Sequence, residues 1–160
     1  MKNAPPGYEC PFCGIAEALP SPAPESAVVL VDANVFALVP THHYAGIKGN
    51  CLVVPRSHYE NVLDIPDDLG SDFFRVTRRL AHAMRNAFGC EGISTERGQV
   101  RLSMVRCDAA GQSRVGGEAG GHRFTPAPSA AISSTVSTIS AIASQRSPAE
   151  LQASDTPWQK

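Results

Sequence analysis

The residues of this chain whose types and spacing could do chemistry are cysteines and histidines in its first sixty positions. Cys10 and Cys13 form a C-x2-C pair, and His58 follows an apolar run that stops at Pro55. Two thiolates at this spacing can bind one tetrahedral ion at about 2.3 Å, as in zinc knuckles. The alternative is a redox pair, which normally opens a helix after a strand. No strand precedes this pair, so we favour a metal site with His58 as third ligand.

The other histidines have weaker claims to a site. His42 and His43 are adjacent, and neighbouring side chains of an extended chain face opposite ways, which makes it hard for them to chelate one ion. We expect an exposed loop or pocket-wall role for them. His82 lies within a helical pattern and is expected at its boundary. His122 stands among glycines with no nearby partner in the sequence.

Three short apolar runs predict the strands that must position these residues. The runs at 27–32 and 35–40 are rich in β-branched residues and are separated by Ala33-Asn34, a plausible hairpin turn. The run at 50–55, NCLVVP, is almost continuously apolar, which is typical of a central strand covered on both faces. Pro55 ends it, because proline cannot donate a hydrogen bond to a neighbouring strand.

From Pro66 the apolar period changes to that of a helix. Apolar side chains recur at three- and four-residue spacing, which predicts an amphipathic helix of about 22 residues; they are Leu69, Phe73, Val76, Leu80, Ala83, Met84 and Ala87. Asp67 and Asp68 complement the helix dipole at its start, and Gly89 is the expected left-handed residue after its end.

Composition limits the classes of function. With 160 residues the chain is one domain at most, and 14 Lys and Arg against 15 Asp and Glu give no electrostatic case for nucleic acid or an anionic membrane. No apolar run reaches about 18 residues, and the N-terminus lacks the apolar stretch of a secretory leader. The five cysteines are an odd number, and Cys51 lies inside an apolar strand pattern. We therefore expect no disulfide framework and a cytoplasmic location.

The chain changes in character near residue 96. We predict a globular domain over residues 1–95 and a disordered tail over 96–160, because Gly, Ala, Ser, Thr and Pro dominate the tail and bury too little apolar surface to offset chain entropy. Apolar residues at helical spacing leave room for one marginal helix near 130–143.

The first part of the chain resembles the histidine-triad (HIT) superfamily of nucleotide hydrolases and transferases. The matching segments are CPFCGIA, VVLVDANVFALVP, GNCLVVPRSHYENVLDIPDDL, the predicted long helix and IST, which together span residues 10 to about 95. The resemblance implies an α+β fold, in which one long helix packs on an antiparallel meander sheet. Family members often form homodimers.

The same resemblance implies a zinc site and a nucleotide pocket. Zinc would be bound by Cys10, Cys13 and His58, with a fourth ligand from near the catalytic motif. The base and ribose would lie against strand residues and the segment before Cys51; the residues implied are Phe36, Leu38, Val39 and Asn50. Asn50 stands where the family usually has histidine, and it could substitute as a hydrogen-bonding side chain.

The motif that names the family has no match here. Family members carry His-x-His-x-His within about 25 residues of the segment matched by IST, and one of these histidines attacks the α-phosphorus of a nucleotide. No His-x-His occurs in this chain, so we assign no catalytic residue. Three readings stay open: an enzyme, a zinc- and nucleotide-binding module without catalysis, and a product of a broken reading frame without activity. Because the final strand of the family has no match, we expect an exposed sheet edge and a tendency of the chain to associate.

Overall fold

The computed structural model describes residues 5–21, 27–44, 49–97, 103–108, 124–126 and 129–145. Its centre is a five-stranded sheet in the order β1-β2-β4-β6-β5, in which every neighbouring pair is antiparallel. The strands are β1 (Val28–Val31), β2 (Val35–Leu38), β4 (Gly49–Pro55), β5 (Gly92–Arg97) and β6 (Ser103–Asp108). The predicted α+β class with an antiparallel sheet is confirmed.

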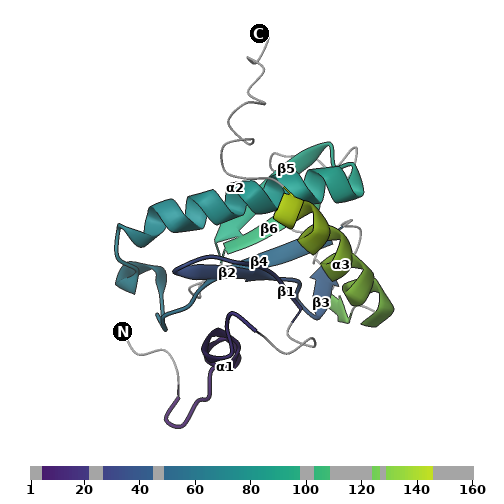
Figure 1. The fold of residues 1–160 in the computed structure, drawn as a ribbon. Coiled ribbons are helices and arrows are strands. Elements are labelled where there is room, and N and C mark those ends of the chain that lie inside the picture. The colour runs from purple at the N-terminus through teal and green to yellow at the C-terminus, as the bar shows by residue number, and fades with distance from the viewer. Residues whose placement is uncertain are drawn as a thin grey trace, which may run out of the picture.

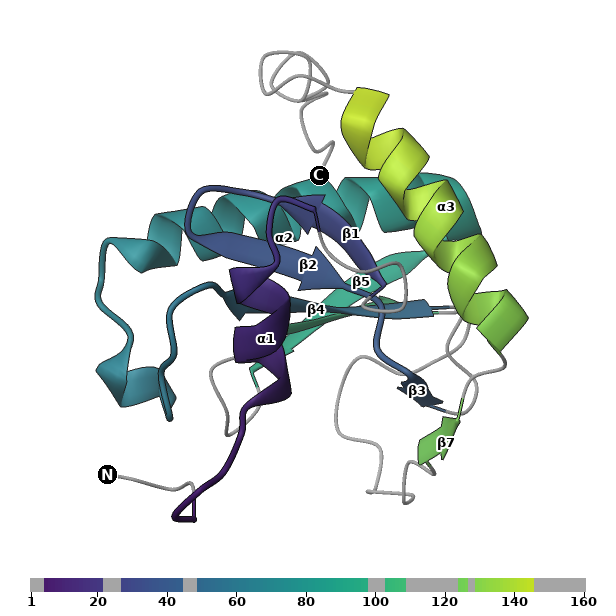
Figure 2. The ribbon, with the colours of Figure 1, turned by 60° about the horizontal axis from the view of Figure 1, so that its bottom comes forward.

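Helices cover both faces of the sheet (Figure 1). On one face lies α2 (Leu69–Phe88), which contacts β2, β4 and β6, and α3 (Ser129–Gln145), which contacts α2 and β1. On the other face lies the short helix α1 (Pro11–Glu17). Figure 2 shows α3 crossing the C-terminal part of α2. The sheet is therefore the middle layer of three.

Strand β4 is the central strand that its continuous apolar run predicts, since all seven of its residues are buried. Alternate side chains serve different layers. Cys51 and Val53 belong to the core beneath α2, whereas Leu52 and Val54 belong to the smaller core beneath α1. A two-sided strand needs apolar residues at every position, which is why this stretch shows no alternation.

Helix α2 follows the predicted pattern closely. Its buried residues are Leu69, Phe73, Val76, Leu80, Ala83 and Met84, and Gly89 ends it with φ 59° and ψ 45°. The left-handed conformation is the reason that glycine suits this position. The helix begins at Leu69 instead of Pro66, after a single 3-10 turn, η2, at Val62–Asp64.

The predicted boundary at residue 96 differs from the structure. Strand β5 runs on to Arg97, and β6 lies between β4 and β5, so the sheet has a strand beyond the predicted domain. Apolar Met104, Val105 and Cys107 supply the side chains that pack there, with both Val105 and Cys107 fully buried. Strand β6 thus occupies the side of β4 that is not paired with β2.

Two further elements lie within the predicted tail. Helix α3 coincides with the helical spacing near 130–143 and buries Ile139 completely against the main core. Strand β7 (Phe124–Pro126) pairs with β3 (His42–Tyr44) in a separate two-stranded sheet. Predicted disorder elsewhere in the tail falls outside the described residues. No helix of the described part is long and apolar enough to cross a bilayer.

The expectation that the cysteines form no disulfide is wrong at one pair. Cys90, just after α2, is bonded to Cys107 of β6, with Cα atoms 5.5 Å apart. Cys10, Cys13 and Cys51 form no disulfide. Sequence spacing could not predict the bond, because it depends on how β6 is placed against the end of α2.

Candidate functional site

The C-x2-C pair lies at the N-terminus of α1. Cys10 is the N-cap residue with extended backbone (φ −80°, ψ 119°), and Pro11 suits the first helical position. The backbone N–H of Cys13 donates to the carbonyl of Cys10 at 3.1 Å, so the two thiols are one turn apart. A redox pair normally opens a helix after a strand. Here the pair opens a helix, but no described strand precedes it.

His58 completes a three-residue group with these thiols. It follows the end of β4, and its Nδ1 lies 3.2 Å from the Sγ of Cys13. The possible ligand atoms of Cys10, Cys13 and His58 all lie within 4.8 Å of one another. Ligands of a tetrahedral zinc ion are separated by roughly 3.5 Å, given metal–ligand distances near 2.0–2.3 Å. The sulfur and nitrogen donors therefore fit zinc.

Other predicted metal candidates do not join this group. His42 and His43 are consecutive residues of β3, paired with Pro126 and Thr125 of β7, and the Nδ1 of His42 is 3.0 Å from the hydroxyl of Thr41. His122, considered above as an isolated histidine, lies outside the described residues. Within the described ranges, the group of Cys10, Cys13 and His58 is the one cluster of such donors.

The predicted nucleotide residues divide between the two faces of the sheet. Phe36 and Leu38 lie beneath α1, whereas Val39 belongs to the core beneath α2. Asn50 alternates with Leu52 along β4 and so shares the face of Phe36 and Leu38. All four are buried, with Phe36 at 0% and Asn50 at 1% exposure. Their assignment to a nucleotide site stays a prediction, and Val39 lies on the face opposite the others.

Asn50 has an unusual environment for a buried amide. Neither its Oδ1 nor its Nδ2 has a hydrogen-bond partner among the described residues. Across the sheet it is paired with Arg106 of β6, which is paired in turn with Ser94 of β5. Residues directly opposite one another share a face, so these three form a polar row across the strands. Arg106 also donates from Nη2 to Glu96.

Arg106 was missed by the sequence analysis because its segment was assigned to the tail. The sequence around it, SMVRCD, contains an apolar run that predicts a short strand, and this was the usable indication. Its position opposite Asn50 depends on the pairing of β4 with β6, which no local pattern reveals.

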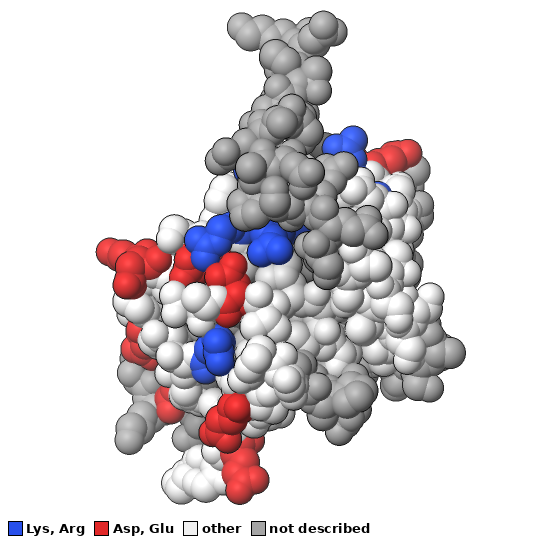
Figure 3. Space-filling model, in the orientation of Figure 1, with Lys and Arg blue, Asp and Glu red and all other residues white. Residues whose placement is uncertain are grey.

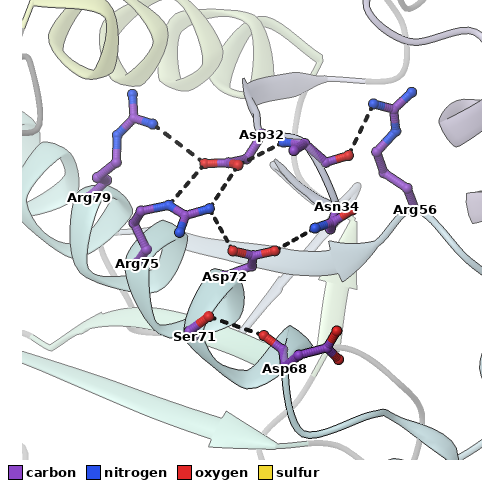
Figure 4. Close-up of polar contacts among 9 residues, drawn as sticks. Asp32, Asn34, Arg56, Asp68, Ser71, Asp72, Arg75 and Arg79 are labelled. Atoms are coloured by element: carbon purple, nitrogen blue, oxygen red, sulfur yellow. Dashed lines mark hydrogen bonds and ion pairs between the residues drawn. The ribbon is translucent and has the colours of Figure 1, made fainter.

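A second polar cluster joins the β1–β2 turn to the start of α2 (Figure 4). The Nη2 of Arg75 donates to Asp32 at 3.0 Å and to Asp72 at 2.6 Å. Asn34 donates from Nδ2 to Asp72 at 2.6 Å, and the Nη1 of Arg79 is 3.9 Å from Asp32. The pairs between hairpin and helix join residues 38 to 47 positions apart, so the cluster connects two elements.

This network lowers the pKa of the carboxyl groups of Asp32 and Asp72. Burial by itself raises the pKa of Asp32, but hydrogen bonds from Arg75 and the Ala33 amide, with the Arg75 and Arg79 charges, outweigh it and hold the pKa below its ordinary value. Hydrogen bonds from Asn34 and Arg75 likewise lower the pKa of Asp72. Acidic and basic atoms intermingle on this side of the molecule in Figure 3.

Comparison with known proteins identifies the family. The HIT domain model matches residues 22–114, more than half of the chain. This chain belongs to the HIT domain family. The match of this HIT chain begins after the C-x2-C pair and continues past Thr95, so family sequence extends beyond the predicted change at residue 96. No His-x-His occurs after residue 114 either.

Two curated relatives resemble the HIT chain over about half their length. The "Protein hit" of Bacillus subtilis is 34% identical over 87 residues, covering 54% of this chain and 55% of the relative. A HIT-like protein of Saccharolobus solfataricus is 31% identical over 84 residues, covering 52% and 56%. The chain thus spans about half the length of the curated relatives it matches.

Solved structures share the fold of the HIT chain. A hypothetical histidine triad nucleotide-binding protein of Sulfolobus tokodaii has a TM-score of 0.64 at 15% identity, covering 84% of this chain and 92% of that protein. A zinc-bound histidine triad family protein of Mycobacterium smegmatis has a TM-score of 0.61 at 17% identity, covering 86% and 94%. At these identities the likeness establishes the fold alone.

Proposed function

We propose that this HIT-family chain is a zinc- and nucleotide-binding protein that is impaired in the histidine-dependent reaction of its superfamily. The observation that carries the proposal is the convergence of Cys10, Cys13 and His58 beside a HIT-type sheet in a chain without a His-x-His motif. Zinc at this group would join α1 to the end of β4. Its chemistry there is structural, because the group lies among packing elements and not beside a histidine nucleophile.

Nucleotide binding is supported by the relatives and by the polar row on the sheet. A solved protein of the same fold is described as nucleotide-binding. In this chain the buried amide of Asn50 has a donor and an acceptor without described partners, and Arg106 opposite it carries a positive charge. An amide can recognise a base or ribose hydroxyl, and a guanidinium suits a phosphate.

The zinc proposal is tested by metal analysis of the purified protein. We expect about one zinc ion per chain, and a loss of most of it in Cys10→Ser and in His58→Ala, because each change removes a ligand of the proposed site. His42→Ala is the matched control, since His42 is outside the group, and it should keep the metal. Unchanged zinc content in the two ligand variants would refute the assignment.

The catalytic proposal is tested with an adenosine phosphoramidate and a dinucleoside polyphosphate. We expect no turnover above background, together with a rise in melting temperature on adding AMP. A ligand at 100 times its dissociation constant stabilises the folded state by about 2.7 kcal/mol. Turnover would make the chain an enzyme with a different nucleophile. Absence of both turnover and stabilisation would favour an inactive product of a broken frame.

Location and assembly complete the proposal. A cytoplasmic location is proposed on Cys10 and Cys13, which form no disulfide, since zinc–thiolate sites require reduced cysteines. A homodimer is proposed by likeness to the family, and a partner that is nucleic acid is not proposed because the net charge is −1.

A further inference from the structure

The disulfide between Cys90 and Cys107 connects two elements that belong to different layers. Cys90 directly follows Gly89, the left-handed residue that ends α2. Cys107 lies in β6, paired across the sheet with Gly49 of β4 and Ile93 of β5. Both cysteines are buried, at 6% and 0% exposure, within the core beneath α2. The bond encloses β5 and most of β6 in one covalent loop.

We propose that Cys90 and Cys107 form a reversible thiol–disulfide switch, which secures the β5–β6 hairpin against α2 when oxidised and loosens that hairpin when reduced. The ligand class is a small dithiol or monothiol reductant and its disulfide. This inference does not rest on the proposed zinc or nucleotide sites.

The exchange is balanced with two equivalents of thiol. A thiolate attacks one sulfur, the Cys90–Cys107 bond breaks, and a mixed disulfide forms while the departing cysteine takes up a proton. A second thiol then attacks the mixed disulfide. The products are two cysteine thiols and one oxidised reductant, so two electrons and two protons pass to the protein. Oxidation by a small disulfide follows the same steps in reverse.

The position of Cys90 suits it to be the sulfur that is attacked. Its neighbours Gly89 and Glu91 are both exposed, so opening of a single turn at the helix end uncovers the bond. In the reduced state an acceptor is already in place, because the Sγ of Cys90 lies 3.5 Å from the carbonyl of Met84 in the last turn of α2. A reduced Cys90 can donate its S–H to this carbonyl.

The third cysteine of this core does not compete for the bond. Cys51 lies on β4 opposite Val105, diagonal to Cys107 on the same face of the sheet. Burial raises the pKa of its thiol to about 12, so it carries almost no thiolate at neutral pH. Within this core, exchange is therefore confined to Cys90 and Cys107.

Strand β5 lies at the edge of the sheet, where β6 is its neighbouring strand. Strand β6 carries a polar cost of its own, because its Arg106 faces Asn50, whose buried amide has no hydrogen-bond partner among the described residues. The disulfide links this edge of the sheet to the end of α2, so its loss should be felt in β5 and β6 before other strands.

The test uses the full chain in defined mixtures of reduced and oxidised dithiothreitol at pH 7. Alkylation and mass spectrometry measure the bond, and amide exchange measures each strand. We expect a reversible transition in native protein, with exchange in β5 and β6 at least about 10-fold faster after reduction and exchange in β1 and β2 nearly unchanged. Closing a loop of this size should also raise the melting temperature by roughly 10 °C.

Two variants separate the switch from general thiol effects. Cys51→Ala should keep the full response, since Cys51 takes no part. Cys107→Ala should show the fast β5–β6 exchange in both redox states. The native protein in its two states suffices if this variant does not fold. The proposal is overturned if the bond breaks only when the whole chain unfolds, if β5 and β6 exchange equally in both states, or if the oxidised buffer never forms the bond.

Discussion

Asn50 is a residue at which stability and ligand binding should oppose each other. Its side chain is 1% exposed, and neither its donor nor its acceptor has a partner in the part of the chain that the structure describes. A buried polar atom without a partner costs about 1–3 kcal/mol. Such a cost persists where a group serves a ligand, so replacing the amide by an apolar side chain should help folding and harm recognition.

We predict that Asn50→Leu raises the free energy of unfolding by about 1 kcal/mol, because it removes the unpaired amide from a buried position. The same variant should lose the AMP-dependent rise in melting temperature. Urea unfolding and thermal shift measure the two effects. As the matched change, Leu52→Asn introduces an amide at the next position on the same face and should lower stability by about 2 kcal/mol or more. A destabilised Asn50→Leu protein would show that the amide has a partner in solution.

At the scale of elements, the charged cluster of Asp32, Asp72 and Arg75 connects the β1–β2 hairpin to α2. Asp32 at the end of the hairpin and Asp72 in the first turn of the helix both bind the guanidinium of Arg75. The side chain of Asp32 is only 14% exposed, which limits solvent screening of its ion pair. The cluster therefore stabilises the contact between the hairpin and α2, in addition to any effect on the helix itself.

The lowered pKa values of Asp32 and Asp72 set the pH range over which the cluster stabilises the fold. A carboxyl whose pKa is lower in the folded state stabilises the fold above its unfolded pKa, which is about 3.9. That contribution is lost as pH falls through the folded value. The cluster should thus stabilise the fold fully at neutral pH and lose this contribution in acid, below about pH 4.

We predict that Asp32→Asn lowers the free energy of unfolding at pH 7 by up to about 1 kcal/mol, the range of partly exposed ion pairs. The difference from the native protein should shrink towards zero below about pH 3, because the native carboxyl is then protonated as well. Urea unfolding between pH 2 and pH 7 measures this. Glu17→Gln, at an exposed carboxyl of α1, is the control. Identical curves for Asp32→Asn and the native protein at every pH would contradict the role.

For the whole molecule, two adjacent phenylalanines of α2 face opposite environments. Phe73 is 4% exposed and lies in the core, whereas Phe74 is 72% exposed on the outer side of the helix. A side chain this apolar gains about 1.5–3 kcal/mol when it is removed from water. An exposed phenylalanine on the longest helix is a candidate contact between two copies of the chain.

We predict that Phe74→Ser leaves the free energy of unfolding nearly unchanged but weakens self-association by about 10-fold or more, through the loss of this apolar contact. Phe73→Ser is the matched control and should destabilise the fold by about 3 kcal/mol or more. Sedimentation over a range of concentrations reports association. A native chain that stays monomeric at every concentration would remove the basis for the homodimer.

The sequence by itself determined the elements that have strong local patterns. The period of apolar residues from Leu69 to Met84 specifies α2, and the continuous run of β4 specifies a strand buried on both faces. The spacing of Cys10 and Cys13 indicated two thiols close enough to bind one ion. In each case the information lies within one segment of the chain, so neighbouring residues suffice to express it.

Only the tertiary structure decided what joins these elements. The pairing of β6 between β4 and β5 places Arg106 opposite Asn50 and brings Cys107 to Cys90. The salt bridge of Arg75 with Asp32 likewise depends on the hairpin and helix meeting. These contacts connect residues 17 to 56 positions apart, and their stability comes from packing around them. A local pattern cannot encode such pairings, because the same residues suit many partners until the layers are assembled.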